Sequence, residues 1–378
     1  MTPPPVTALG SHPAPTERRL ADGRRIFYFD DEPGHSHLET DNRQLEPVDA
    51  RSELRYDAVE DEWVIVAAHR QVRTHLPPSD ECPLCPSTVL RPTEIPAHNY
   101  DVVVFDNRFP SLTPRRPGFD LALGAQADGG PSATGGRCEV ISFTDDHSAS
   151  FATLSRQRLA TIGRAMAHRT DHLGGEPGVE YVLCFENRGQ ETGVTLHHPH
   201  GQVYAYPFVP PRITRSLESA RRYLELRGGC LFCDLVEREL TETSRIVART
   251  DLFVSFVPGA PRWPFEVHTY PLRHVSNLSD LTRDELAELM VMQSKVVATL
   301  DNLFSRPMPY TAGWIQAPVK GDPTLNHLRT TTVAIKRTAE KLKYFAGSES
   351  LVGAFINDVV PEIAAKRLRS AWEHPGHA

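Results

Sequence analysis

The chain has 378 residues, of which 40% are hydrophobic and 24% charged, and its formal net charge is −7. This length allows two domains of ordinary size, and the composition is that of a folded globular protein, which excludes a disordered chain. The acidic balance leaves no basic stripe for nucleic acid, no apolar run approaches about 18 residues, and no signal-like segment is present, so we expect no nucleic-acid partner, no membrane role and a cytoplasmic location.

Residues 1–18 are rich in proline, threonine and alanine and show no hydrophobic period, which predicts a disordered tail. Beyond the tail, two β-rich runs bounded by turn formers, 25–29 and 63–67, predict strands. A more continuous apolar run at 100–105 predicts a buried strand. The chain therefore begins with strands rather than helices.

The next part of the chain alternates between irregular and regular patterns. Residues 112–137 are rich in proline, glycine, alanine and aspartate, which predicts a long surface excursion to which the sequence assigns no role. Helical spacing extends over 156–173 and ends at a pair of glycines. A strand is predicted over 179–185, charged helical residues over 213–226, and an amphipathic helix that begins at a proline over 361–372.

Four of the six cysteines form two Cys-x-x-Cys pairs, Cys82/Cys85 and Cys230/Cys233. Each pair can present two thiolates to one ion, which is half of a tetrahedral zinc site. Three disulfides would suit a secreted chain, and a redox pair is a further alternative, but without an export signal we favour metal ligation.

An internal repeat relates the two halves of the chain. The segment that begins at His147 is echoed by the segment that begins at His274, and a helical pattern follows both. A further 51 residues lead from the first of these to His198, and 53 lead from the second to His327. Each unit is expected to be a sheet with helices packed on it.

The stretch His198-Pro199-His200-Gly201-Gln202 combines residue types suited to phosphoryl chemistry. Side chains at i and i+2 of an extended chain point to the same face, so one imidazole can bind while the other reacts. Pro199 has no N–H, which predicts a strand at the edge of its sheet. Gly201 would let a phosphate approach the backbone, and Gln202 would donate to a phosphoryl oxygen.

This pentad, preceded by Phe185-Glu186-Asn187-Arg188-Gly189, resembles the histidine-triad superfamily and, within it, the galactose-1-phosphate uridylyltransferases. The resemblance extends from residues 19–23 to 355–358. The hydrolases of that superfamily carry a third histidine where this chain has Gln202, and the glutamine marks transferases that pass a nucleotidyl group between phosphates.

The resemblance implies an α+β fold of two tandem histidine-triad-like domains, each an antiparallel sheet with packed helices. The catalytic domain would occupy residues 19–212 and the second domain residues 213–378. In the second domain Arg329 and Thr331 stand where His200 and Gln202 stand in the first, so that half would scaffold or bind rather than react.

For metals, the resemblance implies that two histidines complete each cysteine pair. The expected ligand sets are Cys82, Cys85, His147 and His198 for a structural Zn²⁺ in the catalytic half, and Cys230, Cys233, His274 and His327 for a second Zn²⁺ in the C-terminal half.

The activity implied is UMP transfer from UDP-glucose to galactose 1-phosphate, a reaction of galactose metabolism (the Leloir pathway). His200 would attack the α-phosphorus, and galactose 1-phosphate would then attack the uridylyl-histidine, with Gln202 stabilising the phosphoryl charge. The implied substrate-binding residues are Arg70 and Arg73 for phosphate, Asn107 and Phe109 for uridine, Asn187, Gly193 and Thr195 for the diphosphate pocket, and Lys343 and Glu349 for the hexose and its phosphate.

The resemblance also implies a homodimer with shared active sites. Arg70 and Arg73 follow a predicted strand and have no evident partner within their own segment, so we expect them to act across the subunit boundary. Two alternatives stay open at this point. One is an ADP-sugar or dinucleoside-polyphosphate phosphorylase of the same superfamily, and the other is a non-enzymatic zinc- or nucleotide-binding protein, against which the intact His200 and Gln202 argue.

Overall fold

The computed structural model describes residues 14–47, 50, 52–114, 132–133 and 135–373. Most of the predicted tail, residues 1–13, lies outside the described residues, as does most of the predicted excursion, 115–131 and 134. The disordered tail predicted over residues 1–18 is too long, because Thr16–Arg19 forms strand β1, which pairs with β2 (Arg25–Phe29) along its full length. Hydrogen bonding to β2 orders these residues, although their own composition does not predict a strand.

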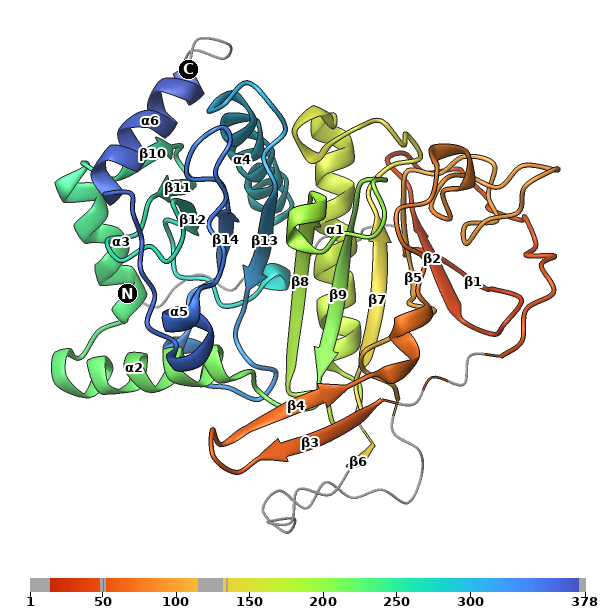
Figure 1. The fold of residues 1–378 in the computed structure, drawn as a ribbon, viewed down its shortest axis with the longest axis horizontal. Helices are drawn as coiled ribbons and strands as arrows, with labels where there is room; N and C mark the ends of the chain where they lie inside the picture. Colours follow the sequence, from red (N-terminus) through yellow and green to blue (C-terminus); the bar gives the residue numbers. More distant parts are fainter. Residues whose placement is uncertain (1–13, 48–49, 51, 115–131, 134, 374–378) are drawn as a thin grey trace.

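Within the described part of the chain, eleven strands form one antiparallel sheet (Figure 1). In spatial order its strands are β1 (Thr16–Arg19), β2 (Arg25–Phe29), β5 (Val102–Asp106), β7 (Arg137–Ser142), β9 (His200–Tyr206), β8 (Tyr181–Arg188), β13 (Tyr310–Ile315), β14 (Arg329–Ala334), β12 (Phe265–Pro271), β11 (Phe253–Phe256) and β10 (Ile246–Arg249). The antiparallel α+β fold class and the predicted strands at 25–29, 100–105 and 179–185 are therefore confirmed. The first has the predicted bounds, and the other two are shifted by one to three residues at their ends.

The strand order shows how the two halves meet. Reading outward from the centre, β8, β9, β7, β5 and β2 on one side mirror β13, β14, β12, β11 and β10 on the other. The central strands β8 and β13 pair directly, for example through Phe185 and Gly313. The internal repeat thus builds one continuous sheet, while a domain boundary at 212/213 stays a prediction.

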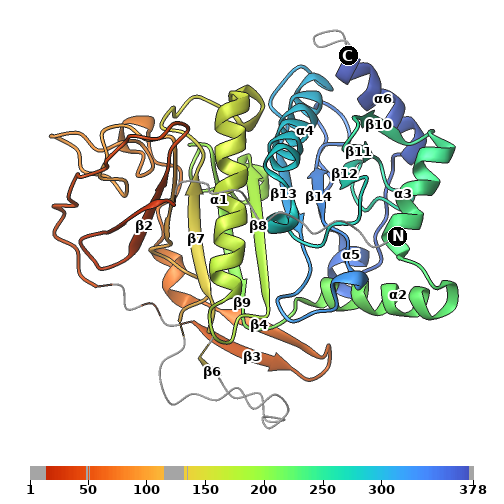
Figure 2. The ribbon, with the colours of Figure 1, turned by 180° about the vertical axis from the view of Figure 1, so that it is seen from behind.

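Two helices, α1 (Arg156–Gly174) and α4 (Arg283–Asn302), lie side by side on one face of this sheet (Figure 2). Both follow a short 3-10 turn, η3 (Phe151–Thr153) or η5 (Leu278–Asp280), and both begin at a hydroxyl that accepts a backbone N–H. Gly163 makes their contact close, because a Cβ there would lie 2.9 Å from Leu286. The buried faces of the two helices join the two halves in one apolar core.

The other helices belong to the C-terminal half. They are α2 (Pro211–Arg227), α3 (Leu231–Glu242), α5 (Gly347–Val352) and α6 (Pro361–Glu373). Helices α2 and α3 pack with Phe256 and Tyr270 on the face of the sheet opposite to α4. The predicted helices at 156–173, 213–226 and 361–372 are confirmed. No helix in the described part of the chain is long and apolar enough to cross a membrane.

The predicted strand at 63–67 exists as β4 (Glu62–Val66) but lies outside the main sheet. It pairs with β3 (Glu53–Asp57), which also pairs with β6 (Ser132–Ala133) from the predicted excursion. The short 3-10 helices η1 (Ala68–Val72) and η2 (Ser79–Glu81) follow β4 and lead to the first cysteine pair. Strand β4 leads directly into residues 68–73, which include Arg70 and Arg73 and are called the arginine segment below. This segment lies near β9 (Figure 1).

The predicted edge position of the strand after Pro199 is wrong. β9 is hydrogen-bonded on both sides, to β7 and to β8. The proline does not interrupt the sheet because it precedes the first paired residue, His200, and its carbonyl accepts a hydrogen bond from Phe143 N at 3.1 Å. A missing N–H therefore has no cost at this position.

Candidate active site

β9 alternates between the core and a cavity. Val203 and Ala205 pack in the apolar core beneath α1, whereas His200 and Gln202 line a cavity of about 410 Å³ on the other face. Gly201 faces the core, where a Cβ would lie 2.8 Å from both Phe143 and the carbonyl oxygen of Phe185. The packing beneath β9 therefore requires a glycine at this position. Because Gly201 faces the core, the geometry does not support its predicted role of letting a phosphate approach the backbone.

The imidazole of His200 has a defined tautomer. Its Nδ1 lies 2.7 Å from the carbonyl oxygen of His198, which can only accept, so Nδ1 carries the proton and Nε2 keeps its lone pair. Burial lowers the pKa of His200, and the hydrogen bond to His198 opposes that effect. At neutral pH the side chain is consequently a neutral base with a free nitrogen at the cavity.

Most of the substrate-binding residues predicted from the sequence line this same cavity: Arg70, Arg73, Asn107, Phe109, Asn187, Gly193 and Thr195, together with His200 and Gln202. They come from three segments that are separate in sequence, 70–73, 107–109 and 187–202. The remaining two, Lys343 and Glu349, are not among the lining residues.

The two arginines reach the cavity within a single chain. Arg70 Nη1 donates to the carbonyl oxygen of Phe109 at 2.5 Å, and Leu76 N donates to the carbonyl oxygen of Thr195 at 2.8 Å. These contacts fix the arginine segment beside the wall that holds His200. Arg70 thus has a partner outside its own segment, and an action of the two arginines across a subunit boundary stays a prediction.

Asn107 and Phe109 lie in the turn that follows β5. Asn107 N donates to Cys138 O at 2.9 Å, and Asn107 Oδ1 accepts from Phe109 N at 2.8 Å. An Asx-type turn of this kind fixes the backbone and leaves the Phe109 ring and the amide at the cavity wall.

The first cysteine pair lies directly beside this cavity. The ligand atoms of Cys82, Cys85, His147 and His198 all lie within 4.8 Å of one another, and His198 is fully buried. His198 Nε2 is 2.7 Å from Thr144 O, so Nε2 carries the proton and Nδ1, 3.6 Å from Cys85 Sγ, is free to ligate. Two thiols and two imidazole nitrogens in this arrangement could hold a metal ion.

The second predicted ligand set is less enclosed. Cys230, Cys233 and His274 form a group of the same kind, with His274 exposed and both cysteines half-buried. His327 falls outside that group, although its Nδ1 lies 3.8 Å from Cys233 Sγ and its Nε2 donates to Arg273 O at 3.1 Å. This arrangement could hold an ion with three ligands, and His327 is close enough to be a fourth after a small adjustment.

Lys343 and Glu349 form a buried ion pair of 2.7 Å in the C-terminal half. Lys343 Nζ also donates to Ile356 O at 2.5 Å. In the single chain the two side chains therefore satisfy each other and do not reach His200.

Glu94 and Arg108 also line the cavity, and the sequence reasoning did not select them. Arg108 could have been found from its place between Asn107 and Phe109. Glu94 had no such signal, since it lies in an irregular segment and its partners are far away in sequence.

Solved structures of other proteins share this fold. A solved structure described as "Structure of uridylyltransferase" superposes with a TM-score of 0.76 at 31% identity, covering 85% of this chain and 98% of that one. An ADP-glucose phosphorylase from Arabidopsis thaliana with bound ADP-glucose superposes with a TM-score of 0.64 at 24% identity, covering 84% of this chain and 98% of that one, and at this identity the likeness concerns the fold alone. The fold is thus that of the nucleotidyl-transferring uridylyltransferases.

The family follows from the sequence matches. The models described as the N-terminal and C-terminal domains of galactose-1-phosphate uridyl transferase match residues 36–210 and 216–377. The galactose-1-phosphate uridylyltransferase of Thermotoga maritima is 38% identical over 322 residues, covering 84% of this chain and 98% of that protein. The chain belongs to the galactose-1-phosphate uridylyltransferase family.

Proposed function

We propose that this chain is a nucleotidyltransferase that carries UMP from UDP-glucose to galactose 1-phosphate. The observation that supports it most is His200, whose Nδ1–H is bound by His198 O while Nε2 is free at a cavity shared with Gln202 and the arginines. The activity named for relatives such as that of Thermotoga maritima agrees with this chemistry.

In the proposed reaction His200 Nε2 attacks the α-phosphorus of UDP-glucose. A P–N bond forms, the P–O bond to glucose 1-phosphate breaks, and glucose 1-phosphate leaves. An oxygen of the galactose 1-phosphate phosphate group then attacks the same phosphorus and breaks the P–N bond, which returns Nε2 to its lone-pair state. The Nδ1 proton stays on its hydrogen bond to His198 throughout.

The side chains around His200 would stabilise the negative charge of the substrate phosphates and hold the substrate in place. Gln202 lines the same cavity as His200 and, as a neutral donor, would stabilise the phosphoryl oxygens without pairing with the nucleophile. Arg70 and Arg73 would supply positive charge to the phosphates. Asn187, Gly193 and Thr195 would shape the diphosphate part of the cavity.

Zn²⁺ is the ion we propose for the buried Cys82/Cys85/His147/His198 site and for the more open site in the other half, since Zn²⁺ favours mixed thiolate and imidazole ligands. In the first site the ion would hold the chain immediately before His200 and would take no part in bond breaking. Its contribution would be to keep His198 O oriented toward Nδ1.

A homodimer with shared sites would bring Lys343 and Glu349 to a cavity. Both lie outside the cavity of their own chain, and the segment around them exposes several large apolar side chains: Tyr344, Phe345, Leu351, Val352, Ile356, Val360 and Ile363. Such a surface is typical of one that a partner covers. A cytoplasmic location stays a prediction from the sequence.

The test is covalent labelling. UDP-glucose labelled in the uridine, without an acceptor, should leave an acid-labile label that maps to His200. His200→Gly should lose labelling and sugar-phosphate transfer but regain transfer from uridine 5′-phosphoimidazolide, which supplies the missing imidazole. His197→Gly is the matched control, because His197 is exposed and does not line the cavity, and it should behave as the native chain.

Retention of transfer by His200→Gly, or absence of label on the native chain, would refute the nucleophile. A parallel panel of UDP-glucose and ADP-glucose distinguishes the proposed substrate from the ADP-sugar alternative.

A further inference from the structure

The face of the sheet that lines the cavity continues into the C-terminal half. Gln202 of β9 is opposed by Phe185 of β8, which is opposed on its other side by Gly313 of β13. Gly313 is in turn opposed by Thr331 of β14. Directly opposed residues point to one side of a sheet, so Arg329, two residues before Thr331, lies on the same face as Gln202.

Three arginines from separate segments lie near one another here: Arg212 in the first turn of α2, Arg262 in the loop before β12, and Arg329 at the start of β14. Partial desolvation lowers the pKa of Arg212, and the positive charges of Arg262 and Arg329 lower it further. The guanidinium carbon of Arg329 lies over the Phe232 ring, 5.3 Å from its centre. That of Arg262 lies over the Phe355 ring at 5.1 Å. Stacking of this kind uses the flat face of a guanidinium group and leaves its N–H groups free to donate.

These guanidinium groups have no acceptor within the described part of the chain. None of the three forms an ion pair or donates a side-chain hydrogen bond there, and Arg329 Nη1 is buried without a partner. Among the described charges that act most strongly on Arg212, only Glu266 is negative. Glu266 Oε2 already accepts from Arg262 N at 2.7 Å, and its Oε1 accepts from His268 Nε2 at 2.9 Å. The three arginines therefore carry donors that the described chain does not use.

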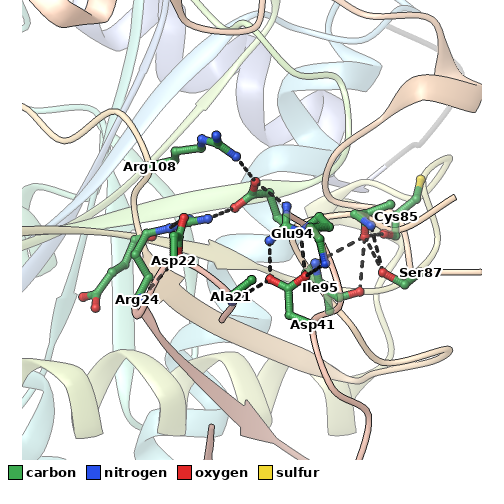
Figure 3. A network of polar contacts seen from close by, with 12 residues as sticks. Ala21, Asp22, Arg24, Asp41, Cys85, Ser87, Glu94, Ile95 and Arg108 are labelled. Carbon is green, nitrogen blue, oxygen red and sulfur yellow. Dashed lines mark hydrogen bonds and ion pairs between the residues drawn. The ribbon is translucent and has the colours of Figure 1, made fainter. Parts of the chain in front are cut away.

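The arginines in the network behind one end of the cavity are paired (Figure 3). Three arginines and three carboxylates take part: Arg24, Arg43, Arg108, Asp22, Asp41 and Glu94. Glu94 accepts from Arg24 at 2.5 Å and from Arg43 at 2.7 Å, across 70 and 51 residues of sequence. That network is neutral as a whole. In the C-terminal half, three positive charges and the one negative charge of Glu266 leave two positive charges in excess.

We propose that Arg212, Arg262 and Arg329 form a second binding site, separate from the cavity at His200, for the phosphate group of a small ligand. Guanidinium donors match the oxygens of a phosphate, and a phosphate dianion would neutralise the two excess charges. The start of α2 adds positive potential, since its first turn contains no acidic residue and no side chain caps it. None of the three arginines lines the cavity at His200.

The place of this site agrees with the internal repeat. Arg329 takes the position of His200, so the C-terminal half would bind a phosphate where the N-terminal half carries its histidine. Strands β8 and β13 separate β9 from β14, a distance of about 14 Å, which leaves room for two separate phosphates. Arg212 and Arg262 are exposed and open the site to solvent, whereas Arg329 is half-buried.

Calorimetric titration of the full chain with inorganic phosphate tests the site. A chain carrying Arg70→Met and Arg73→Met is the background, because these changes remove the cavity arginines and leave the proposed site to be measured. This chain should bind one phosphate. Adding Arg329→Met should weaken the binding by about tenfold or more, the effect of losing a charge-assisted hydrogen bond. Arg329→Lys should retain part of the affinity.

Arg212→Met separates ligand binding from damage to the neighbouring cysteine and histidine group. Arg329 lies two residues from His327, whereas Arg212 belongs to α2 and is exposed. Arg212→Met should weaken phosphate binding by a similar factor and leave Tm in phosphate-free buffer unchanged.

The matched control is Arg222→Met, which removes the same charge from an exposed position of α2. Arg222 lies ten residues beyond Arg212, about 15 Å along the helix. At physiological ionic strength its charge is screened over that distance, so the dissociation constant should change by less than about twofold.

Glucose 1-phosphate and UMP, titrated into the same background chain, show whether the group attached to the phosphate contributes to binding. Binding of any of the three ligands that depends on both Arg212 and Arg329 supports the site. The proposal fails if the background chain binds none of them, or if Arg212→Met and Arg329→Met leave binding unchanged. An equal loss in Arg222→Met would show an effect of net charge alone and would also overturn it.

If the background chain does not fold, Arg212→Met in the otherwise native chain should lower the number of phosphates bound per chain by one. An unchanged number would refute the site. These titrations do not depend on the labelling of His200, so this proposal and the proposed function stand or fail independently.

Discussion

Glu186 is a buried carboxyl group in β8, 3% exposed and one residue before Asn187. Burial raises the pKa of Glu186 to about 7, against the opposing effects of Tyr310 and Arg188. The folded protein therefore holds this proton more tightly than the unfolded chain does. Stability contributed by the protonated group is present below the ordinary glutamate pKa and is lost as the pH rises through about 7.

Glu186→Gln should consequently raise Tm at pH 8 and leave it almost unchanged at pH 4.5, because the amide is neutral at both. The gain at pH 8 has an upper bound of about 3 kcal/mol. Glu180→Gln is the control, since Glu180 is partly exposed and pairs with Lys320. Melting curves measured across this pH range would contradict the assignment if both variants had the same pH dependence.

Gly201 and Gly313 are strand glycines with different surroundings. A Cβ at Gly201 would lie 2.8 Å from a backbone oxygen that cannot move cheaply, whereas the nearest atom to a Cβ at Gly313 is 3.7 Å away. Gly201→Ala should cost about 1–3 kcal/mol of unfolding free energy and disturb the adjacent His200. Gly313→Ala should stay within about 0.5 kcal/mol. Equal shifts of the denaturation midpoint would disprove this packing account.

At the scale of elements, the two cysteine pairs differ in their enclosure. The first lies in an apolar cluster with Tyr100 and Leu84, while the second starts the short helix α3 and has an exposed histidine beside it. A chelator reaches an open site faster than a closed one, so the two Zn²⁺ ions proposed for these sites should leave at different rates.

We expect a mild chelator to remove the ion at Cys230/Cys233 first, with little effect on labelling of His200. Elemental analysis and Tm during the chelation should show two steps. Cys233→Ser should abolish only the fast step, and Cys85→Ser should abolish the slow step and lower Tm more. Loss of both ions at one rate, or of the buried ion first, would contradict the role of enclosure.

In a dimer of the whole molecule, the cavity that holds His200 in one chain would receive Lys343 from the other chain. Arg70 and His200 line one cavity in a single chain, and Lys343 does not reach it. If a second chain supplies Lys343, a His200→Ala chain and a Lys343→Ala chain can restore one site between them. In randomly mixed dimers about a quarter of the sites would be intact.

The contrasting mixture is Arg70→Ala with His200→Ala. Both changes would damage the cavity of their own chain, so this mixture should recover no activity. Recovery here would instead show that the arginines act across the subunit boundary, and failure of the Lys343 mixture would show that Lys343 has no part in a shared site. Transfer assays after denaturation and refolding of the mixed chains measure both.

Features that depend on neighbours along the chain could be predicted from the amino-acid sequence. Hydrophobic spacing, together with the glycines that end one helix and the proline that begins the other, predicted α1 and α6. The internal repeat predicted two related units, and the structure shows that their strands form one sheet. These features follow from local backbone geometry, which a sequence expresses directly.

Features that depend on pairing between distant segments could not be predicted from the amino-acid sequence and are seen only in the folded chain. β9 is central rather than at an edge because β7 and β8 pair with it, Thr16–Arg19 is ordered because β2 lies beside it, and Glu94 finds its arginines 51 and 70 residues away. Such contacts are selected by the packing of the whole sheet, since a strand leaves its hydrogen-bonding edges open to any partner of suitable register. No local pattern in the sequence specifies which partner that will be.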